Sequence, residues 1–506
     1  MKLKRFFTLA LALCMIAGLL AGCGDKSNDP GTTDEKDTLN VALTEEPDYL
    51  STCDTDSLMC AQMNLLTYNG LTRIDMKTLQ PELDLAESYS QDSDTEWTFV
   101  LKQGVTFHNG DTLTAEDVKA SIEYAKSYDR TSTYTSAISE VQVVDDNTVK
   151  IITSVPAPNL LFDLGYHFNC ILPHSLIESG NDFNANPVGT GPYKFVSWDK
   201  GNALKFEANE AYFDAERTPS IKNLVFSIIP EGTTRTMALE SGDVDFIYSV
   251  SSTDIDRLKA EDGIDMEEVV SVENFFLYLN AVNGPFVDSN LRLAVAYAIN
   301  REDIVAGALN GYGEPSYSCV PMGYAESVDT NAYSYDLDKA KEYLAAWGGD
   351  PSTVTMNIIC SNDTKTAIAT IMQSELAELG INVVIDSTDS ATYQAAMATD
   401  TLSAAIVSWS PANAASYVSR FHSDRRSNTP ASVATDKMDE LVSEMRVEMD
   451  ANARTDLIHQ IIGEANATCW YVPIYQVEYF RAHSSQLQNV VCSATGYVDF
   501  AVTTWG

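Results

Sequence analysis

The sequence predicts an α/β protein in which strands and helices alternate along most of the chain. Runs with apolar residues at every second position indicate strands, and capping residues followed by apolar residues at helical spacing indicate helices. No single repeat dominates the 506 residues, so we expect mixed α/β lobes rather than a sandwich or a barrel. At roughly 150 residues per domain, the chain has room for two or three domains.

The N-terminal segment 1–22 is typical of a secretory signal peptide. Three basic residues at positions 2 to 5 precede an apolar stretch at 6–20. This stretch is shorter than the ~20 residues that a helix needs to cross a bilayer. We therefore expect the segment to be removed and the rest of the chain to lie outside the cytoplasm.

Cys23 directly follows this segment, and Leu20-Ala21-Gly22-Cys23 resembles the bacterial lipobox. The resemblance implies that the Cys23 thiol takes a diacylglyceryl group and that Cys23 becomes the mature N-terminus. Residues 23–37 would form a flexible tether, because they contain too few apolar side chains to fold. Lipidation would hold the protein on the outer face of the cell membrane. The alternative is an ordinary signal peptide that happens to contain a cysteine.

The chain is strongly acidic, with 72 Asp and Glu against 32 Lys and Arg. Loss of segment 1–22 would leave 29 basic residues and a net charge of −43, which repels phosphate backbones, so we expect no nucleic-acid partner. Seven cysteines follow Cys23, and an odd number leaves at least one free thiol in a monomer. Cys53 and Cys60 are the one pair that we expect to form a disulfide.

Strand and helix signals are clear in the first third of the chain. Residues 38–43 alternate as a strand and end in a polar loop at 44–49. Trp97, Phe99 and Leu101 alternate on one face of a second strand, the alternation repeats at 105–107, and Asn109-Gly110 marks a tight turn. Thr114 and Asp117 then have the spacing of a capping box at the start of a helix.

Several segments resemble the family 5 extracellular solute-binding proteins, which include the dipeptide, oligopeptide and nickel binders of ABC importers. The resemblance covers residues 38–506, and its landmarks occur in family order. They are WTFVLKQGVTFHNGDTLTAEDVKASIEYA (97–125), NPVGTGPYKFVSWDKG (186–201), ALESGDVDFI (238–247), the segment 274–315 and WYVPIYQVEYF (470–480).

The resemblance implies a two-lobe, periplasmic-binding-protein-like (type II) fold with an extra domain inserted in the first lobe. Two crossover strands would join the lobes, with the hinge near residues 279–283 and 481–486. The expected division is 38–80, 188–277 and 484–506 for the first lobe, 81–187 for the inserted domain, and 278–483 for the second lobe.

The residues themselves agree with this division at the start of the second lobe. Phe275, Leu277 and Leu279 alternate as a strand. Asp288 or Ser289 can then cap a helix with an apolar stripe.

Catalytic motifs are missing from the sequence, since it has no HExxH, GxSxG or Walker loop. The six histidines are scattered, and we expect His108 to be an exposed turn residue beside Asn109-Gly110. Gly189-Thr190-Gly191 lacks the third glycine of a dinucleotide loop and is interpreted as a tight turn. We therefore predict no enzyme activity, no catalytic residue, no metal site and no cofactor. A secreted hydrolase is the remote alternative.

The function that the resemblance implies is that of a lipid-anchored substrate-binding protein of an ABC importer. The protein would act as a monomer, capture a small solute between its lobes and deliver it to the permease subunits and their ATPases. A peptide is the first candidate ligand, and a nickel chelate or a sugar is the alternative.

Loops at strand ends are where open α/β lobes hold their ligands, so the candidate ligand contacts are taken from such loops. Trp409 could stack on a ligand while its N–H donates, and Trp409→Ala should then weaken binding with almost no change in thermal midpoint. The alternatives are a packing role for Trp409 at the edge of a core and for Tyr49 in the first lobe. The candidates are Glu46, Tyr49, Thr190, Trp409 and Asn413.

Residues 409–417 depart from the peptide-binding relatives, in which an Asp near a tryptophan grips the free amine of the peptide. This stretch contains no carboxylate, and Asn413 brings no negative charge. Short peptides with free termini would therefore not be held in the usual dipeptide manner. Either a carboxylate outside this stretch binds the amine of the peptide, with Glu45 or Glu46 the nearest candidates, or the ligand is longer, blocked at its termini or not a peptide.

Overall fold

The computed structural model describes residues 36–54, 57–399, 401–411, 413–425, 435–469 and 471–506. The chain from Thr38 to Gly506 forms one compact unit. The predicted signal segment and the predicted lipidation site, Cys23, lie outside the described residues.

A sheet of 11 strands runs through this unit and confirms the predicted α/β class. Its order is β15-β14-β16-β12-β17-β11-β1-β10-β9-β8, with β13 paired to β17. The strands are β1 Thr38–Leu43, β8 Tyr193–Asp199, β9 Ala203–Ala208, β10 Asn223–Ile228, β11 Phe246–Ile247, β12 Ile264–Leu279, β13 Glu314–Pro315, β14 Thr355–Cys360, β15 Asn382–Ser387, β16 Ala404–Trp409 and β17 Tyr471–Ser484.

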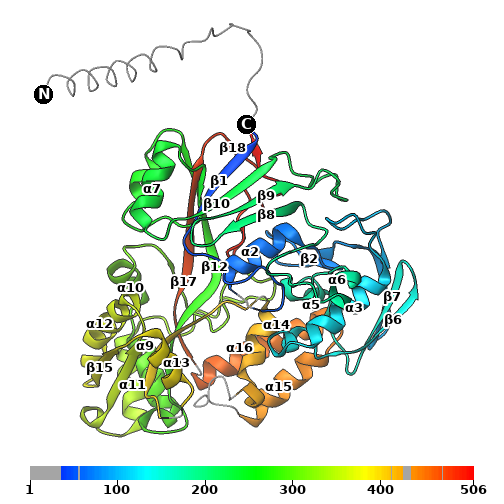
Figure 1. Cartoon of the computed structure of the whole chain (residues 1–506). Coiled ribbons are helices and arrows are strands. Elements are labelled where there is room, and N and C mark those ends of the chain that lie inside the picture. Colours follow the sequence, from blue (N-terminus) through cyan, green and yellow to red (C-terminus); the bar gives the residue numbers. More distant parts are fainter. Residues whose placement is uncertain (1–35, 55–56, 400, 412, 426–434, 470) are drawn as a thin grey trace, which may run out of the picture. The chain divides into compact units, whose positions relative to one another are not determined.

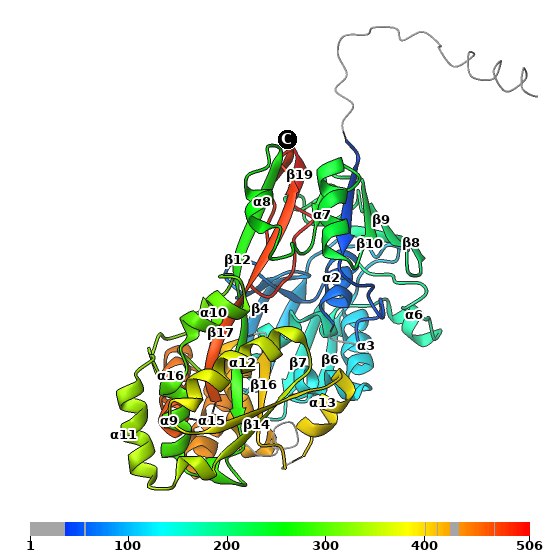
Figure 2. The ribbon, with the colours of Figure 1, turned by 90° about the vertical axis from the view of Figure 1, so that its left-hand side faces the viewer.

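Two long strands, β12 and β17, connect the two halves of this sheet. They pair antiparallel from Ile264↔Ser484 to Tyr278↔Tyr471. One end of β17 pairs with β11 in the first lobe, whereas the opposite end of β12 pairs with β16 in the second lobe. Figures 1 and 2 show β12 and β17 side by side along their length. The lobes are thus joined by two adjacent strands.

The pairing of these strands is interrupted between Val270 and Asn274. The side chain of Gln476 compensates there, because its amide donates to the carbonyl oxygens of Ser271 (2.8 Å) and Met322 (2.9 Å). Residues 279–283, where we expected one hinge segment, instead follow the end of β12 beside β16, since the Asn280 N–H donates to the Ser403 carbonyl.

The first lobe is built on the half of the sheet that contains β1. In β1, buried and partly exposed residues alternate over the first four positions. From Val41 to the end of the strand every residue is buried. Its core joins β1 and helix α2 to the Phe206, Phe226 and Phe246 side chains. The remaining elements of this lobe are α2 Leu58–Thr67, β2 Thr72–Ile74, β3 Pro81–Leu83, α7 Gly232–Ser241, α8 Ile255–Lys259, β18 Leu487–Gln488 and β19 Thr504–Trp505.

The inserted domain is an antiparallel sheet of order β4-β5-β7-β6, with α3 packed on one face. The predicted strand face is confirmed, since Trp97, Phe99 and Leu101 are all buried in its core. The elements are β4 Ala86–Ser93, β5 Glu96–Leu101, α3 Ala115–Lys126, α4 Ser132–Thr135, β6 Ile138–Asp145, β7 Thr148–Thr153, α5 Leu160–Leu164 and α6 His174–Glu178.

The predicted capping box at the start of α3 is confirmed. The Asp117 carboxylate accepts hydrogen bonds from the backbone N–H of Thr114 (2.7 Å) and from that of His174 (2.8 Å). The prediction of an exposed His108 was wrong. His108 is half-buried and its Nε2 lies 2.9 Å from the Gly191 carbonyl oxygen, because the turn packs against the loop that precedes β8.

The second lobe covers the other half of the sheet with helices. Asp288 caps α9, as predicted, by accepting a hydrogen bond from the Asn290 N–H. The apolar stripe of α9 is buried against β12, β14 and α12 residues in one core. The helices are α9 Ser289–Ala298, α10 Arg301–Ala308, α11 Leu337–Trp347, α12 Asp363–Ala377, α13 Ser390–Met397, α14 Ala414–Val418, α15 Asp436–Val447 and α16 Ala451–Thr468.

Cysteines in the described part of the chain are unpaired. The predicted disulfide between Cys53 and Cys60 is therefore wrong, and both thiols are buried. Cys60 lies inside α2, where its Sγ accepts from the Tyr49 N–H (3.4 Å), whereas the Cys53 thiol lies toward the Phe168 carbonyl. Among the described helices, none combines the length and the apolar character that a membrane crossing requires.

Candidate functional site

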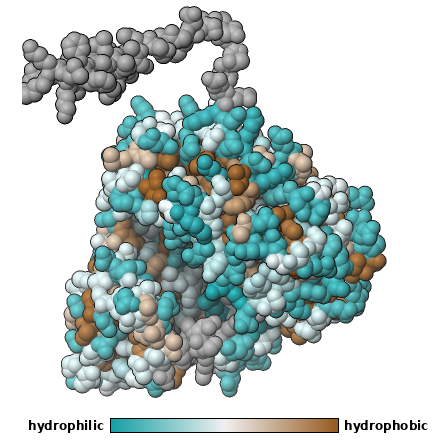
Figure 3. Space-filling view, viewed as in Figure 1, coloured by the Kyte–Doolittle hydropathy of each residue, from teal (hydrophilic) through white to brown (hydrophobic). Residues whose placement is uncertain are grey.

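Aromatic side chains meet where the inserted domain faces the second lobe. Tyr134 of α4 and Tyr166, just after α5, stack with ring centroids 4.3 Å apart and an interplanar angle of 10°. Tyr324 of the second lobe lies near Tyr166, which adds to the burial that raises the pKa of Tyr324 well above its usual value. Figure 3 shows a hollow between the side that carries α9–α13 and the side that carries α2 and α3. We define the interlobe cleft by Tyr134, Asp163, Tyr166, Tyr324, Trp409 and Arg420.

The second-lobe wall of the interlobe cleft is built around Trp409, at the end of β16. Its ring packs against those of Phe276, Tyr417 and Tyr471, with centroids between 4.7 and 5.8 Å apart. The guanidinium carbon of Arg420 lies over the same ring, 5.1 Å from its centroid. Trp409 thus anchors the strand end to the lobe core and supports a cation on its ring.

One acidic residue, Asp163, and one basic residue, Arg420, lie near Tyr134. Asp163 adds to the burial that raises the pKa of Tyr134, and Arg420 opposes this shift. Asp163 belongs to α5 of the inserted domain, whereas Arg420 follows α14 of the second lobe. The interlobe cleft therefore has an acidic group on one wall and a basic group on the other.

The three candidate residues of the first lobe have other partners. The Glu46 carboxylate accepts hydrogen bonds from the indole N–H of Trp198 and from the Gly201 N–H, both 2.7 Å long. Tyr49 is 43% exposed. Thr190 is buried, and its hydroxyl donates to the Asn69 side-chain oxygen (3.0 Å). None of these placements shows a ligand contact, so the three assignments stay predictions.

Asn413 lies on the second lobe, close to Trp409 in sequence. Its side-chain oxygen accepts a hydrogen bond of 2.7 Å from the Ser416 N–H and caps α14. Among the described residues, no hydrogen bond, ion pair or ring contact joins any two of the five candidates. Direct contacts thus do not connect the candidates, and all five stay predictions; Trp409 is the candidate included in the interlobe cleft as defined above.

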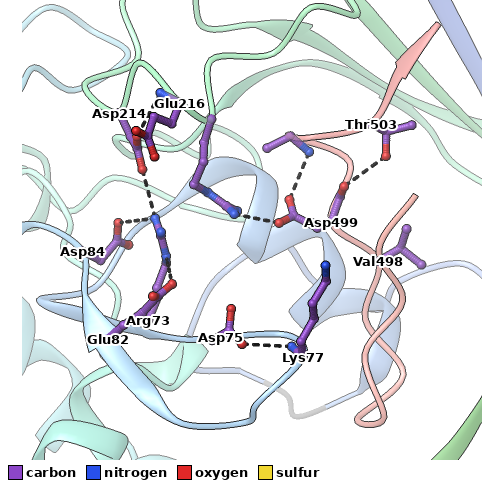
Figure 4. A network of polar contacts seen from close by, with 12 residues as sticks. Arg73, Asp75, Lys77, Glu82, Asp84, Asp214, Glu216, Val498, Asp499 and Thr503 are labelled. Carbon is purple, nitrogen blue, oxygen red and sulfur yellow. Dashed lines mark hydrogen bonds and ion pairs between the residues drawn. The ribbon is translucent and has the colours of Figure 1, made fainter. Parts of the chain in front are cut away.

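A cavity of about 720 Å³ lies in the first lobe and the inserted domain, and it shares Tyr166 with the interlobe cleft. Its described lining comes from α2, the β2–β3 region, the loops after α5 and β9, and the C-terminal segment 489–504. Arg73 on its wall pairs with Glu82 (2.7 Å), Asp214 (3.2 Å) and Asp84 (3.5 Å), as Figure 4 shows. Arg73 is thus shared by three carboxylates, and in the described part of the chain the cavity receives no residue from the second lobe.

Sequence reasoning missed most of the interlobe cleft. Tyr134 and Tyr166 lie on short helices and loops that carry no strong periodic signal. Asp163 did leave a signal, because it is the one acid in the apolar run Leu160-Leu161-Phe162-Asp163-Leu164. An acid on a helix whose neighbours are buried in a core is an indication of a special environment.

Metal binding finds no support in the described residues, which contain no group of three or more His, Cys, Asp or Glu side chains placed to hold an ion. Several of the histidines there lie beside single carboxylates. His174 pairs with Asp117, and His483 lies 3.4 Å from Glu267.

Two lobes that share a pair of crossover strands and face each other across an aromatic cleft define a two-lobe solute-binding fold. The structure of HbpA2 from Haemophilus parasuis has this fold, with a TM-score of 0.83 at 22% identity over 93% of this chain and all of that chain. The predicted periplasmic-binding-protein-like type II fold is thus confirmed.

The model of the bacterial extracellular solute-binding proteins, family 5 (Middle), matches residues 80–429, and this chain belongs to that family. It is 28% identical to the oligopeptide-binding protein AppA of Bacillus subtilis over 76% of this chain and 75% of that protein. It is 29% identical to the glutathione-binding protein GsiB of Pectobacterium atrosepticum over 64% of this chain and 63% of that protein. The match thus spans less than two thirds of the glutathione-binding relative.

Proposed function

We propose that this protein is the substrate-binding component of an ABC importer, and that it captures a small solute, in the first place a peptide, in the interlobe cleft. Family membership supports the class, and relatives named for oligopeptides and glutathione support a peptide ligand. The observation that carries the proposal is the proximity of Tyr166 of the inserted domain and Tyr324 of the second lobe, which are close enough to interact electrostatically across the cleft.

Ligand capture would work by a population shift between open and closed forms. A solute that contacts both walls binds the closed form more tightly and so draws the equilibrium toward closure. A shift from 1:99 to 99:1 requires about 5.5 kcal/mol of differential affinity. We place the hinge at the interrupted pairing between Val270 and Asn274, because few backbone hydrogen bonds need to break there.

The domain division predicted from the sequence and the anchor at Cys23 are part of the proposal. A lipid at Cys23 would keep the binding unit near its permease, with residues 24–37 as the tether. Replacement Cys23→Ser should release the protein from membranes into the medium, as immunoblots of cell fractions would show. Retention of the variant in the membrane fraction would contradict the lipid anchor without affecting the binding function.

Two measurements test the binding function. Mass spectrometry of the protein, purified from its own host under native conditions, should detect a solute bound one to one. Small-angle scattering should then show that the protein becomes more compact when the identified solute is added back to stripped protein. Absence of any captured solute would contradict the binding function, whereas binding without compaction would contradict closure alone.

A further inference from the structure

We propose that Asp163 is the counter-ion for a cationic nitrogen of the ligand, and that Tyr134 and Tyr166 flank this nitrogen in the interlobe cleft. The inference rests on the proposed function and deepens it, since it assigns the polarity and chemical class of the solute. It also places the cation on the inserted domain rather than on residues 409–417 of the second lobe, which contain no carboxylate.

The backbone of Asp163 is fixed, but its carboxylate is not used by the fold. Its N–H donates to the Asn159 carbonyl (2.9 Å), and its own carbonyl accepts from the Asn169 side-chain amide (2.8 Å). In the described part of the chain, no hydrogen bond or ion pair to the Asp163 carboxylate is found. Burial alone raises its pKa well above the usual value, and no nearby cation opposes the shift.

The helix that carries Asp163 turns it away from the domain core. Leu160 and Leu164 of α5 are buried in the core of the inserted domain, whereas Asp163 keeps partial exposure. A carboxylate that is largely removed from water without a partner is costly, and a cation from the ligand would remove that cost. The side chain is therefore poised for a partner that the described protein does not supply.

Two tyrosines lie close to Asp163, since the Tyr166 N–H donates to the Asp163 carbonyl (3.2 Å) and the Tyr134 ring stacks on that of Tyr166. Tyr134 interacts electrostatically with Asp163 and is stacked on Tyr166. The same Asn169 amide that holds the Asp163 carbonyl also donates to the Tyr134 carbonyl (3.4 Å), which keeps the two residues together. Aromatic faces attract cations, so an acid with two adjacent tyrosines suits an ammonium group.

The opposite wall carries the complementary charge. Arg420 is exposed, lies over Trp409, and has no ion pair among the described residues. A guanidinium of this kind suits a carboxylate or another anion. The ligand is thus a zwitterion or a longer molecule with its cationic end toward the inserted domain and its anionic end toward the second lobe.

The test compares the wild-type protein with Asp163→Asn and with Asp94→Asn, which makes the same exchange at an exposed turn of the inserted domain. Each protein is incubated with a small-molecule extract of host cells, re-isolated, and its bound solute is released and identified by mass spectrometry. We expect the wild-type protein and Asp94→Asn to capture a solute with a basic nitrogen. Asp163→Asn should bind that purified solute about 10- to 100-fold more weakly in calorimetry.

Thermal unfolding is the control for misfolding of the variants. In this measurement Asp163→Asn should be no less stable than the wild-type protein, because among the described residues the carboxylate has no partner to lose. Equal affinity of Asp163→Asn for the captured solute, or a solute without a basic nitrogen, would overturn the inference and leave the proposed function intact. If the wild-type protein captures no solute, the proposed function fails and the inference fails with it. Arg420→Gln should weaken binding of the same solute without removing the requirement for its basic nitrogen, and an unchanged affinity would overturn the assigned polarity.

Discussion

The carboxylate of Glu46 lies 2.7 Å from the indole nitrogen of Trp198 and accepts its hydrogen bond. The same oxygen accepts from the backbone N–H of Gly201, so the loop after β1 is tied to the turn between β8 and β9. Glu46 thus has a defined role in the first lobe that the sequence did not indicate.

Replacement of Glu46 by Ala should destabilise the protein by about 1 kcal/mol, because two donors lose a charged acceptor that is only partly shielded from water. Ligand affinity should change little. Urea unfolding of the variant provides the measurement, and Glu45→Ala is the control, since Glu45 is exposed. A variant with normal stability and strongly weakened ligand binding would restore Glu46 as a ligand contact.

Trp409→Ala should lower the stability of the second lobe by about 3 kcal/mol. We revise the expectation of an unchanged thermal midpoint because three rings pack against this indole. Affinity for the ligand should also fall, since Arg420 loses the surface on which it lies. Trp409→Phe, which keeps an aromatic ring, is the control, and calorimetric unfolding is the readout. An unchanged midpoint for Trp409→Ala would contradict the packing role.

Arg301→Met should destabilise the second lobe by about 3 kcal/mol or more. The Arg301 side chain is fully buried and donates to backbone carbonyls rather than to an acid, including those of Tyr333 (2.7 Å) and Pro473 (2.8 Å). Methionine fills a similar volume but leaves these carbonyls without a donor. Lys341→Met on the exposed face of α11 is the matched control. A loss no larger than that of the control in urea unfolding would contradict this account.

His174 should contribute to stability in a pH-dependent manner. Its Nδ1 lies 2.7 Å from the Asp117 carboxylate, and this hydrogen bond raises the pKa of His174 above 6.5. The protonated imidazole therefore stabilises the folded state below about pH 6.5, and this stabilisation is lost as the pH rises through the raised pKa. The wild-type protein should exceed His174→Gln in stability most at about pH 5 and least at about pH 9.

His459→Gln is the control for that series, because His459 is exposed and its Nε2 lies 3.1 Å from a backbone carbonyl oxygen, that of Glu326, rather than from a carboxylate. Unfolding free energies at several pH values provide the comparison. A difference between wild type and His174→Gln that stays constant with pH would show that the ion pair does not form.

Local sequence signals predicted the elements well. The capping box of Thr114 and Asp117, the Asp288 cap and the strand face of Trp97, Phe99 and Leu101 were all found as expected. Each of these features depends on residues a few positions apart, whose geometry is fixed by one helix or strand. The predictions that failed, for His108 and for the pair of Cys53 and Cys60, depended on how distant segments pack.

The prediction of ligand-contact residues was limited in the same way, because it too depends on how distant segments pack. The rule of strand-end loops pointed to Trp409, which carries Arg420 over its ring and stays a prediction as a ligand contact. Glu46 and Thr190 follow the same rule, yet their polar groups are used by Trp198 and Asn69. A single sequence does not reveal whether a polar side chain will find a partner from another part of the chain.

The sequence by itself determined the α/β class, the family and the order of the elements, because hydrophobic periodicity, caps and motif order are local properties of the chain. Only the tertiary structure decided that Tyr134, Asp163 and Tyr166 face Tyr324 and Arg420. These residues are up to 286 positions apart in the sequence, and they meet because β12 and β17 hold the two lobes together. The proposed binding surface thus depends on long-range packing, which short-range patterns do not encode.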